Sequence, residues 1–329
     1  MKDVARRAGV AESTVSRVIS GRKFVAAETR EAVERAMREL NFHRDAHASR
    51  LARGRSDFLG LVISDVSNPF YAEMIKAFES AALAQGFEVL LATTHYDARR
   101  TEGIFRRLIQ NKSPGVAVMT SRVDAAFGQQ LARRGVYSVF LDSAAAGPWR
   151  SNIRLDYQHG AGEAVRYLHR LGHRRFALVA GPQSRASHVS YRKAVQSELK
   201  ALRCQVTVLE GDNTSEGGAA AAAAVMTRAR MPTAVLCSND LTAFGFTGAL
   251  VRAGLRVPQE VSVVGADDIP FARLFHPPLT TVRMPQASLG AMAFEVLSEM
   301  ITKRVKAGKN LELATELVVR ESAAPRASA

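Results

Sequence analysis

From Phe58 onward, short apolar runs alternate with segments of helical periodicity, and this alternation restricts the possible folds more than any other feature. Runs such as FLGLVI (58–63), GVAVM (115–119) and FALVA (176–180) have the length and composition of strands that are buried on both faces. Such strands separated by helices indicate parallel βαβ units. The runs are too many for one sheet of ordinary width. The sequence therefore predicts an α/β body of two similar halves that meet near residues 156–160.

The predicted elements follow one another through both halves. Strands are expected at 58–64, 87–92, 115–119, 136–141, 152–155, 176–180, 205–209, 233–237 and 261–265, with helices at 70–85, 99–111, 124–134, 160–171, 189–202, 216–228 and 240–253. The stretch 286–304 is expected to return to the first lobe, and the strand near 315–320 to cross to the second. Lobe 1 would then comprise about 58–157 and 285–312, and lobe 2 about 158–284 and 313–322.

The amino-terminal sequence MKDVARRAGVAESTVSRVIS contains two short apolar stripes of helical spacing on either side of a glycine. The stripes consist of Val4, Ala5 and Ala8 before the glycine, and of Val15, Val18 and Ile19 after it. Gly9 permits a turn that a Cβ atom would oppose, and two helices joined by such a turn form a helix-turn-helix. The second helix is expected to follow Ala11, or to begin later with Ser13 as its cap. The alternative is an amphipathic helical pair without a role in DNA binding.

The outward face of the second helix is polar, as in a helix that enters the major groove of DNA. The residues of this helix predicted to contact DNA are Glu12, Ser13, Thr14, Ser16 and Arg17. Arg17 is expected to read a guanine, because its guanidinium matches O6 and N7. A third helix, predicted over 28–40, closes a helix-turn-helix domain of residues 1–45. Arg22, in the loop before it, is expected to contact a phosphate.

Composition supports a nucleic-acid partner and excludes several classes of protein. The net charge is +14, and residues 1–57 contain 13 Lys and Arg against 8 Asp and Glu, so basic charge is denser at the amino end. Two cysteines, Cys204 and Cys237, are too few for a disulfide scaffold and fit a reducing, cytoplasmic location. The sequence has no apolar run of membrane-spanning length, so no membrane association is expected.

No enzyme signature stands out. His159-Gly160-Ala161-Gly162 lacks the third glycine of a dinucleotide-binding loop, and the sequence contains no G-x-S-x-G. His169 and His173 are four residues apart, but Gly172 interrupts the helix between them. We therefore expect neither catalytic residues nor a metal or cofactor.

The segment MKDVARRAGVAESTVSRVISG, followed by FVAAETREAVERAMRELNF and by the α/β body, resembles the LacI/GalR (lac-repressor-type) family of bacterial transcription regulators. The resemblance covers nearly the whole chain, although the family usually has Ser where Ala11 stands. It implies an N-terminal all-α helix-turn-helix domain and a two-lobed, periplasmic-binding-protein-like (type I) effector domain over 58–329. It also implies that residues 46–57 form a hinge helix that inserts Leu51 into the minor groove. The alternative for this segment is a plain basic linker.

Several polar and aromatic residues follow the predicted strands, where ligands of α/β proteins bind. The candidate effector-binding residues are Phe70, Tyr71, Asp142, Asp156, Arg185, Ser187, Asn239 and Asp267. The resemblance places Asp142, Arg185, Asn239 and Asp267 at family positions that hydrogen-bond the effector. The alternative for each acid is a helix N-cap, because each precedes a helix or a turn.

The sequence thus predicts a homodimeric repressor that binds a near-palindromic double-stranded DNA operator under the control of a small-molecule effector. A tail without leucine heptads favours a dimer over a tetramer. A sugar or a sugar phosphate is the first expectation for the effector, and a purine or nucleoside is the alternative. A further alternative is a cytosolic sugar-binding protein without a role at DNA.

Overall fold

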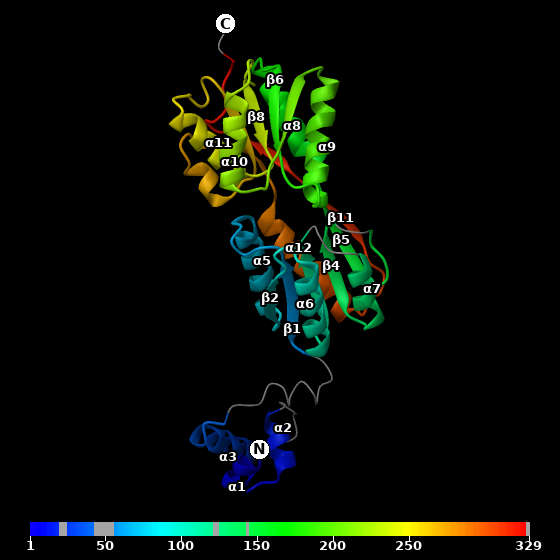
Figure 1. The fold of residues 1–329 in the computed structure, drawn as a ribbon. Helices are drawn as coiled ribbons and strands as arrows, with labels where there is room; N and C mark the ends of the chain where they lie inside the picture. The colour runs from blue at the N-terminus through cyan, green and yellow to red at the C-terminus, as the bar shows by residue number, and fades with distance from the viewer. Residues whose placement is uncertain (20–24, 43–55, 121–124, 143–144, 327–329) are drawn as a thin grey trace. The chain divides into compact units, whose positions relative to one another are not determined.

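The computed structural model describes residues 1–19, 25–42, 56–120, 125–142 and 145–326. The chain forms two compact units, residues 1–56 and residues 57–329, and each is described by itself (Figure 1). Arg22, Leu51 and most of the predicted linker 46–57 lie outside the described residues.

The amino-terminal unit contains three helices: α1 (Lys2–Ala8), α2 (Glu12–Ile19) and α3 (Ala27–Glu39). Gly9 ends α1 in the left-handed conformation, with φ 65°, as the predicted turn requires. Val4, Val15 and Val33, one from each helix, are fully buried and form the centre of the small core. Helix α2 begins directly after Ala11, so Ser13 lies inside the helix, and the suggested later start is wrong.

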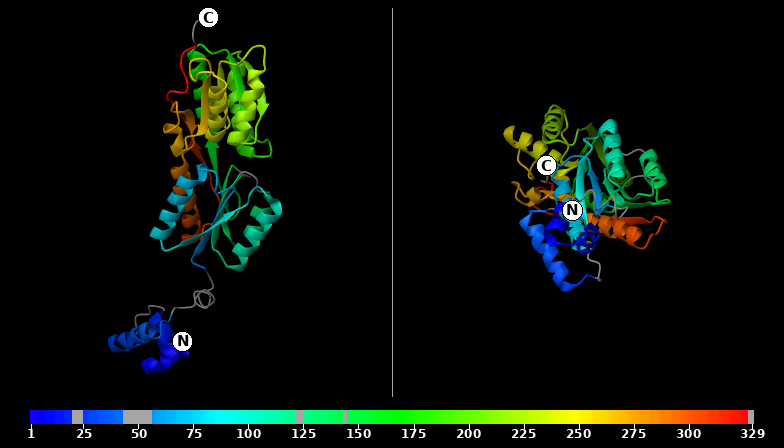
Figure 2. Two further views of the ribbon diagram at one scale, coloured as in Figure 1. Left: turned by 60° about the vertical axis from the view of Figure 1, so that its left-hand side comes forward. Right: turned by 90° about the horizontal axis from the view of Figure 1, so that it is seen from below.

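Residues 57–329 form two lobes, and each lobe is built on a six-stranded sheet within the described part of the chain (Figures 1 and 2). The sheet of lobe 1 has the order β11-β5-β4-β3-β1-β2, and that of lobe 2 has the order β12-β10-β9-β8-β6-β7. The strands of lobe 1 are β1 (Phe58–Ile63), β2 (Glu88–Thr93), β3 (Gly115–Met119), β4 (Tyr137–Leu141), β5 (Arg150–Asp156) and β11 (Asn310–Ala314). Those of lobe 2 are β6 (Arg175–Ala180), β7 (Gln205–Glu210), β8 (Ala234–Cys237), β9 (Ser262–Asp267), β10 (Thr280–Arg283) and β12 (Glu316–Val318).

Helices cover both faces of each sheet (Figure 1). The helices of lobe 1 are α5 (Phe70–Ala84), α6 (Ala98–Gln110), α7 (Ala125–Arg133) and α12 (Gln286–Thr302), and those of lobe 2 are α8 (Tyr157–Arg170), α9 (Ala186–Ala201), α10 (Ser215–Met226) and α11 (Asp240–Arg252), with the short helix η1 (Pro270–Arg273). Successive residues of the central strands alternate between the two faces. Leu61 packs with α5 and α12, whereas Val62 packs with α6 and α7. Continuous apolar runs therefore serve two cores at once, and the predicted fold class is confirmed.

The chain crosses between the lobes three times, at Asp156–Tyr157, between β10 and α12, and between β11 and β12. Strands β10 and β11 do not figure in the sequence prediction. β10 is only four residues long, and β11 alternates exposed and half-buried residues at the sheet edge, so neither has a buried apolar run. Within the described part of the chain, no helix is long and apolar enough to span a lipid bilayer.

Candidate effector cavity and DNA-binding helix

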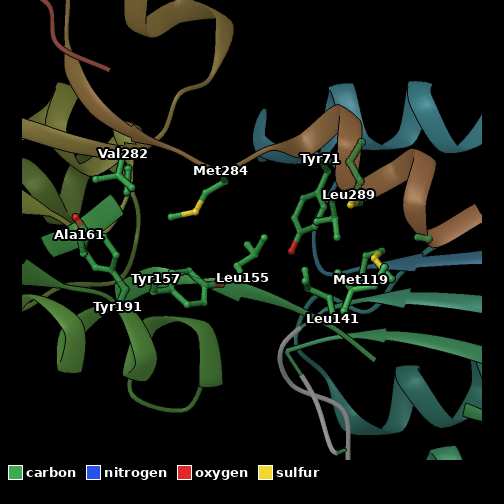
Figure 3. Close-up of a cluster of buried hydrophobic side chains, with 14 of the residues drawn as sticks. Tyr71, Met119, Leu141, Leu155, Tyr157, Ala161, Tyr191, Val282, Met284 and Leu289 are labelled. Atoms are coloured by element: carbon green, nitrogen blue, oxygen red, sulfur yellow. The ribbon is translucent and has the colours of Figure 1, made fainter. Parts of the chain in front are cut away.

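A cavity lies between the two lobes, at the carboxyl ends of the strands. Five aromatic rings line it, namely Phe70, Tyr71, Tyr96, Tyr157 and Tyr191. Figure 3 shows Tyr71 and Tyr191 on opposite sides of the space, with Leu155 and Met284 from the crossing segments between them. Because the two lobes supply opposite walls, a ligand held here would contact both.

The lobe 1 wall is fixed by the loop after β1. Ser64 and Thr120, at the ends of neighbouring strands, share a hydrogen bond of 2.6 Å, and the Tyr71 hydroxyl donates to Ser64 Oγ at 3.0 Å. The Phe70 ring meets the Tyr71 ring edge-on at 5.1 Å. Burial raises the pKa of Tyr71, so its hydroxyl remains a neutral donor. These bonds hold both rings at the cavity in fixed orientations.

The lobe 2 wall is built largely by the first turns of α9. Arg185, Ser187, His188 and Tyr191 line the cavity from this segment. The Arg185 guanidinium lies 3.6 Å from the centre of the Tyr96 ring, which is a cation–π contact between the two lobes. Burial, together with the nearby Arg185 charge, lowers the pKa of His188 to about 4. His188 is therefore a neutral imidazole at physiological pH.

Asp267 ends β9 and lines the cavity with a buried carboxylate. Its backbone has φ 111°, a conformation that few side chains adopt. The backbone carbonyl accepts hydrogen bonds from Met284 and Gln286, but the carboxylate has no partner among the described residues. Burial, with a smaller contribution from the charge of Asp240, raises the pKa of Asp267 well above its usual value. An unpaired buried carboxylate of this kind is suited to receive donors from a ligand.

A second buried carboxylate supports the segment that follows Asp267. Asp240, the first residue of α11, accepts hydrogen bonds from the Thr281 hydroxyl and, at 2.9 Å, from the Ile269 backbone N–H. Burial raises its pKa to about 7. Asp268 is held by ion pairs with Arg283 at 2.7 Å and with Arg320 at 2.6 Å. The positions of Asp267 and Asp268 are therefore fixed from several sides.

Asp240 leads to a testable pH dependence. Because its pKa is raised above the unfolded value, the folded state binds a proton more tightly, and this contribution to stability is lost as pH rises through about 7. Between pH 5 and pH 8 the wild-type protein should lose roughly 3 kcal/mol of unfolding free energy through this group. Asp240→Asn should remove that share of the loss. Urea unfolding at the two pH values measures it.

The matched control is Asp156→Asn, because asparagine also caps helices and Asp156 lies at the start of α8. This variant should keep the pH dependence of the wild-type protein. An Asp240→Asn protein whose stability falls with pH as steeply as that of the wild type would contradict the assignment.

The structure brings five of the eight predicted effector-binding residues to the cavity: Phe70, Tyr71, Arg185, Ser187 and Asp267. It does not bring the other three there. Asp142 lies beside a different pocket, where it accepts hydrogen bonds from the Tyr157 hydroxyl at 2.6 Å and from the Leu155 N–H at 3.1 Å. Asp156 borders the same pocket and caps α8, whereas Asn239 caps α11 by accepting from Thr242. These contacts match the helix-cap alternative for Asp156 and Asn239.

Sequence reasoning missed Tyr96, Tyr157, His188 and Tyr191, which also line the cavity. Tyr191 had a usable signal, because it lies four residues after Ser187 and so shares a face of α9 with it. Tyr96 follows the edge strand β2 in a loop with left-handed backbone, φ 58°, and no periodic pattern marks it. Among the described residues, no group of three or more His, Cys, Asp or Glu residues is placed to hold a metal ion.

The predicted DNA-contacting face of α2 is available in the amino-terminal unit. Val15 and Val18 are buried against α1 and α3. Glu12, Ser13, Ser16 and Arg17 are exposed, and Thr14 is half-buried. A short helix thus presents one long cation, one acid and several hydroxyls on a single side, which suits contacts with both phosphates and base edges.

Comparisons with known proteins match both parts of the chain. The family profile described as "Bacterial regulatory proteins, lacI family" matches residues 1–45, and the profile described as "Periplasmic binding protein-like domain" matches residues 165–323. The "HTH-type transcriptional repressor PurR" of Erwinia tasmaniensis is 34% identical over 330 residues, which cover 98% of this chain and 96% of the relative.

Solved structures show the same fold. A crystal structure of the lac repressor dimer bound to operator and the anti-inducer ONPF has a TM-score of 0.88 and 28% identity, with 98% of each chain covered. The complex of the transcriptional regulator CelR with cellobiose has a TM-score of 0.74 and 32% identity, again with 98% of each chain covered.

Proposed function

Because this chain belongs to the lacI family of bacterial regulatory proteins, we propose that a purine base or nucleoside in the cavity controls its affinity for operator DNA. The chain is a DNA-binding repressor with an effector domain, and it is not an enzyme. As a regulator that acts on DNA, it is assigned to the cytoplasm. The relatives named PurR favour the purine alternative over the sugar that the sequence first suggested.

The observation that carries this proposal is the aromatic lining of the cavity. Five rings surround the space, and a planar heteroaromatic ligand can stack on rings or meet their edges. The sequence suggested fewer, because Tyr96, Tyr157 and Tyr191 are brought to the cavity only by folding. A sugar remains a second candidate, because the CelR relative binds cellobiose and aromatic rings also cover sugar faces.

The buried carboxylate of Asp267 further supports a purine. A purine edge that carries ring N–H and amino groups can donate two hydrogen bonds to one carboxylate. Such bonds would satisfy a group that has no partner among the described residues. Ser187 and Asn213, from α9 and the loop before α10, offer further polar contacts to the rest of the ring.

We assign DNA recognition to the exposed face of α2, with Arg17 reading a guanine and Glu12, Ser13, Thr14 and Ser16 beside it. A homodimer would place two such helices on a near-palindromic operator. The edge strand β2 offers a dimer surface, because Leu90 and Leu91 are 42% and 39% exposed there. The proposed contacts of Arg22 with phosphate and of Leu51 with the minor groove concern residues outside the described part of the chain.

Two measurements test this function. Selection from a randomised duplex pool should yield a near-palindromic operator. Fluorescence anisotropy on that operator should then change at least tenfold in apparent affinity with guanine, hypoxanthine, adenine or their nucleosides, whereas ribose, glucose and cellobiose should have no effect. A response to a sugar and to no purine would overturn the purine assignment and leave the DNA-binding function standing.

A further inference from the structure

The first turn of α9 is the most polar part of the cavity wall. Arg185 precedes the helix in an extended conformation, and its side chain does not cap the helix. The first N–H groups of a helix lack partners within the helix, and the helix dipole makes this end positive. Arg185, Ser187 and His188 all line the cavity at this point. An anion in the cavity would therefore meet a guanidinium, a hydroxyl and a helix amino end together.

His188 is an independent sign that a ligand group is bound here. Its ring packs over Gly181, where a Cβ atom would lie only 2.7 Å from the imidazole Cγ. The ring is desolvated, yet neither of its nitrogens has a hydrogen-bond or ion-pair partner among the described residues. A buried polar group without a partner costs free energy, and a ligand acceptor beside the ring N–H would remove that cost. Asn213 lies over the same glycine, with Oδ1 3.0 Å from the position of that Cβ.

The acids near Arg185 leave its guanidinium available to a ligand. Asp65 and Asp212 are close enough for the Arg185 charge to contribute to lowering the pKa of each carboxylate. Both carboxylates are bonded within their own loops, Asp65 to the Ser67 N–H at 2.9 Å and Asp212 to the Thr214 N–H at 2.9 Å. Neither forms an ion pair with Arg185, which instead stacks on Tyr96. A planar guanidinium stacked on a ring keeps its edge N–H groups available for a phosphate.

We propose that the first turn of α9 is an anion subsite of the effector cavity, and that the effector carries a phosphate group, as a purine mononucleotide does. This inference rests on the proposed binding of the effector in the cavity. The remaining groups that face the cavity divide the ligand between two ends. The anion lies against Arg185, Ser187 and His188, whereas the donor edge of the base lies against Asp267. A ligand with a negative group and an N–H edge at opposite ends satisfies both.

Isothermal titration calorimetry on the full-length chain tests the subsite. Guanosine 5′-monophosphate should bind at least tenfold more tightly than guanosine, and adenosine 5′-monophosphate is compared with adenosine in the same way. In Arg185→Gln the ratio between nucleotide and nucleoside should fall to near one. The matched control is Arg192→Gln on the same helix, because Arg192 pairs with Glu210 at 2.6 Å and does not line the cavity. That variant should keep the wild-type ratio.

Ribose and ribose 5-phosphate, as a second ligand pair, separate the two proposals. Tighter binding of ribose 5-phosphate, dependent on Arg185 and without purine binding, would support the anion subsite and refute the purine. Purine binding with equal affinities for nucleoside and nucleotide would overturn the subsite and leave the proposed function intact. Binding of none of these compounds would overturn both. Thermal unfolding of each variant checks that it is folded.

Discussion

The Asp267→Asn protein is expected to bind its effector at least a hundredfold more weakly than the wild-type protein and yet to unfold at a higher temperature when ligand-free. The loss of affinity corresponds to about 2.7 kcal/mol. It follows from replacing a carboxylate that accepts two ligand donors by an amide that has one acceptor and presents an N–H group to the other donor. Titration calorimetry with the identified effector measures it.

The gain in stability has a separate cause. In the ligand-free protein the Asp267 carboxylate is buried without a partner among the described residues, and its pKa is raised well above the usual value. The unfolded state then binds the proton more weakly than the folded state, so stability falls as pH rises toward the folded pKa. Asparagine does not ionise and tolerates the positive φ of this position. The difference between variant and wild type should therefore grow with pH.

Asp142→Asn is the matched control for this prediction. Asp142 is also a buried carboxylate with a raised pKa, but Tyr157 and Leu155 donate to it and it lies outside the cavity. Its replacement should lower stability, because a hydrogen bond is lost, and should leave effector affinity within about threefold of wild type. If Asp142→Asn weakens effector binding as much as Asp267→Asn does, the assignment of Asp267 as the principal contact is wrong.

The contrast between these two acids shows what the sequence could predict about the site. Both follow buried strands, and chain position gives them the same prospect of reaching a ligand. The difference lies in Tyr157, whose hydroxyl reaches Asp142 only once the chain has crossed between the lobes. Arg185, Ser187 and Asp267 were predictable because the carboxyl ends of parallel strands meet at one edge. Tyr96 and His188 were not, because their places depend on how one lobe packs against the other.

The fold was more accessible than the site. Strands such as β1 and β6 are buried on both faces, so their continuous apolar runs mark them without ambiguity. Strand β11 lies at a sheet edge and contains Asn310 and Glu312, which face solvent, so its pattern is indistinguishable from that of a loop. The glycine turn after α1 was predictable for a local reason, because a left-handed residue is required where one helix ends and the next begins two residues later.

Replacing Arg17 by alanine should weaken binding to the selected operator by on the order of a hundredfold or more, while non-specific duplex binding should fall only slightly. A bidentate contact between arginine and guanine contributes about 1–3 kcal/mol per half-site, and a homodimer would lose two of them. A phosphate contact would instead weaken binding to all sequences alike and reduce the salt dependence of affinity by about one unit of slope. Anisotropy titrations at several salt concentrations, on operator and on random duplex, separate the two roles.

Arg38→Ala provides the control, because Arg38 is an exposed cation of the same unit in the last turn of α3, away from the α2 face. It removes the same charge and so measures the general electrostatic contribution to DNA binding. Arg17→Lys adds a second comparison, since lysine keeps the charge and loses the planar fork that matches O6 and N7 of guanine. If Arg17→Lys restores full operator affinity, or if Arg17→Ala weakens operator and random DNA equally, Arg17 contacts phosphate and the bases are read by other residues of α2.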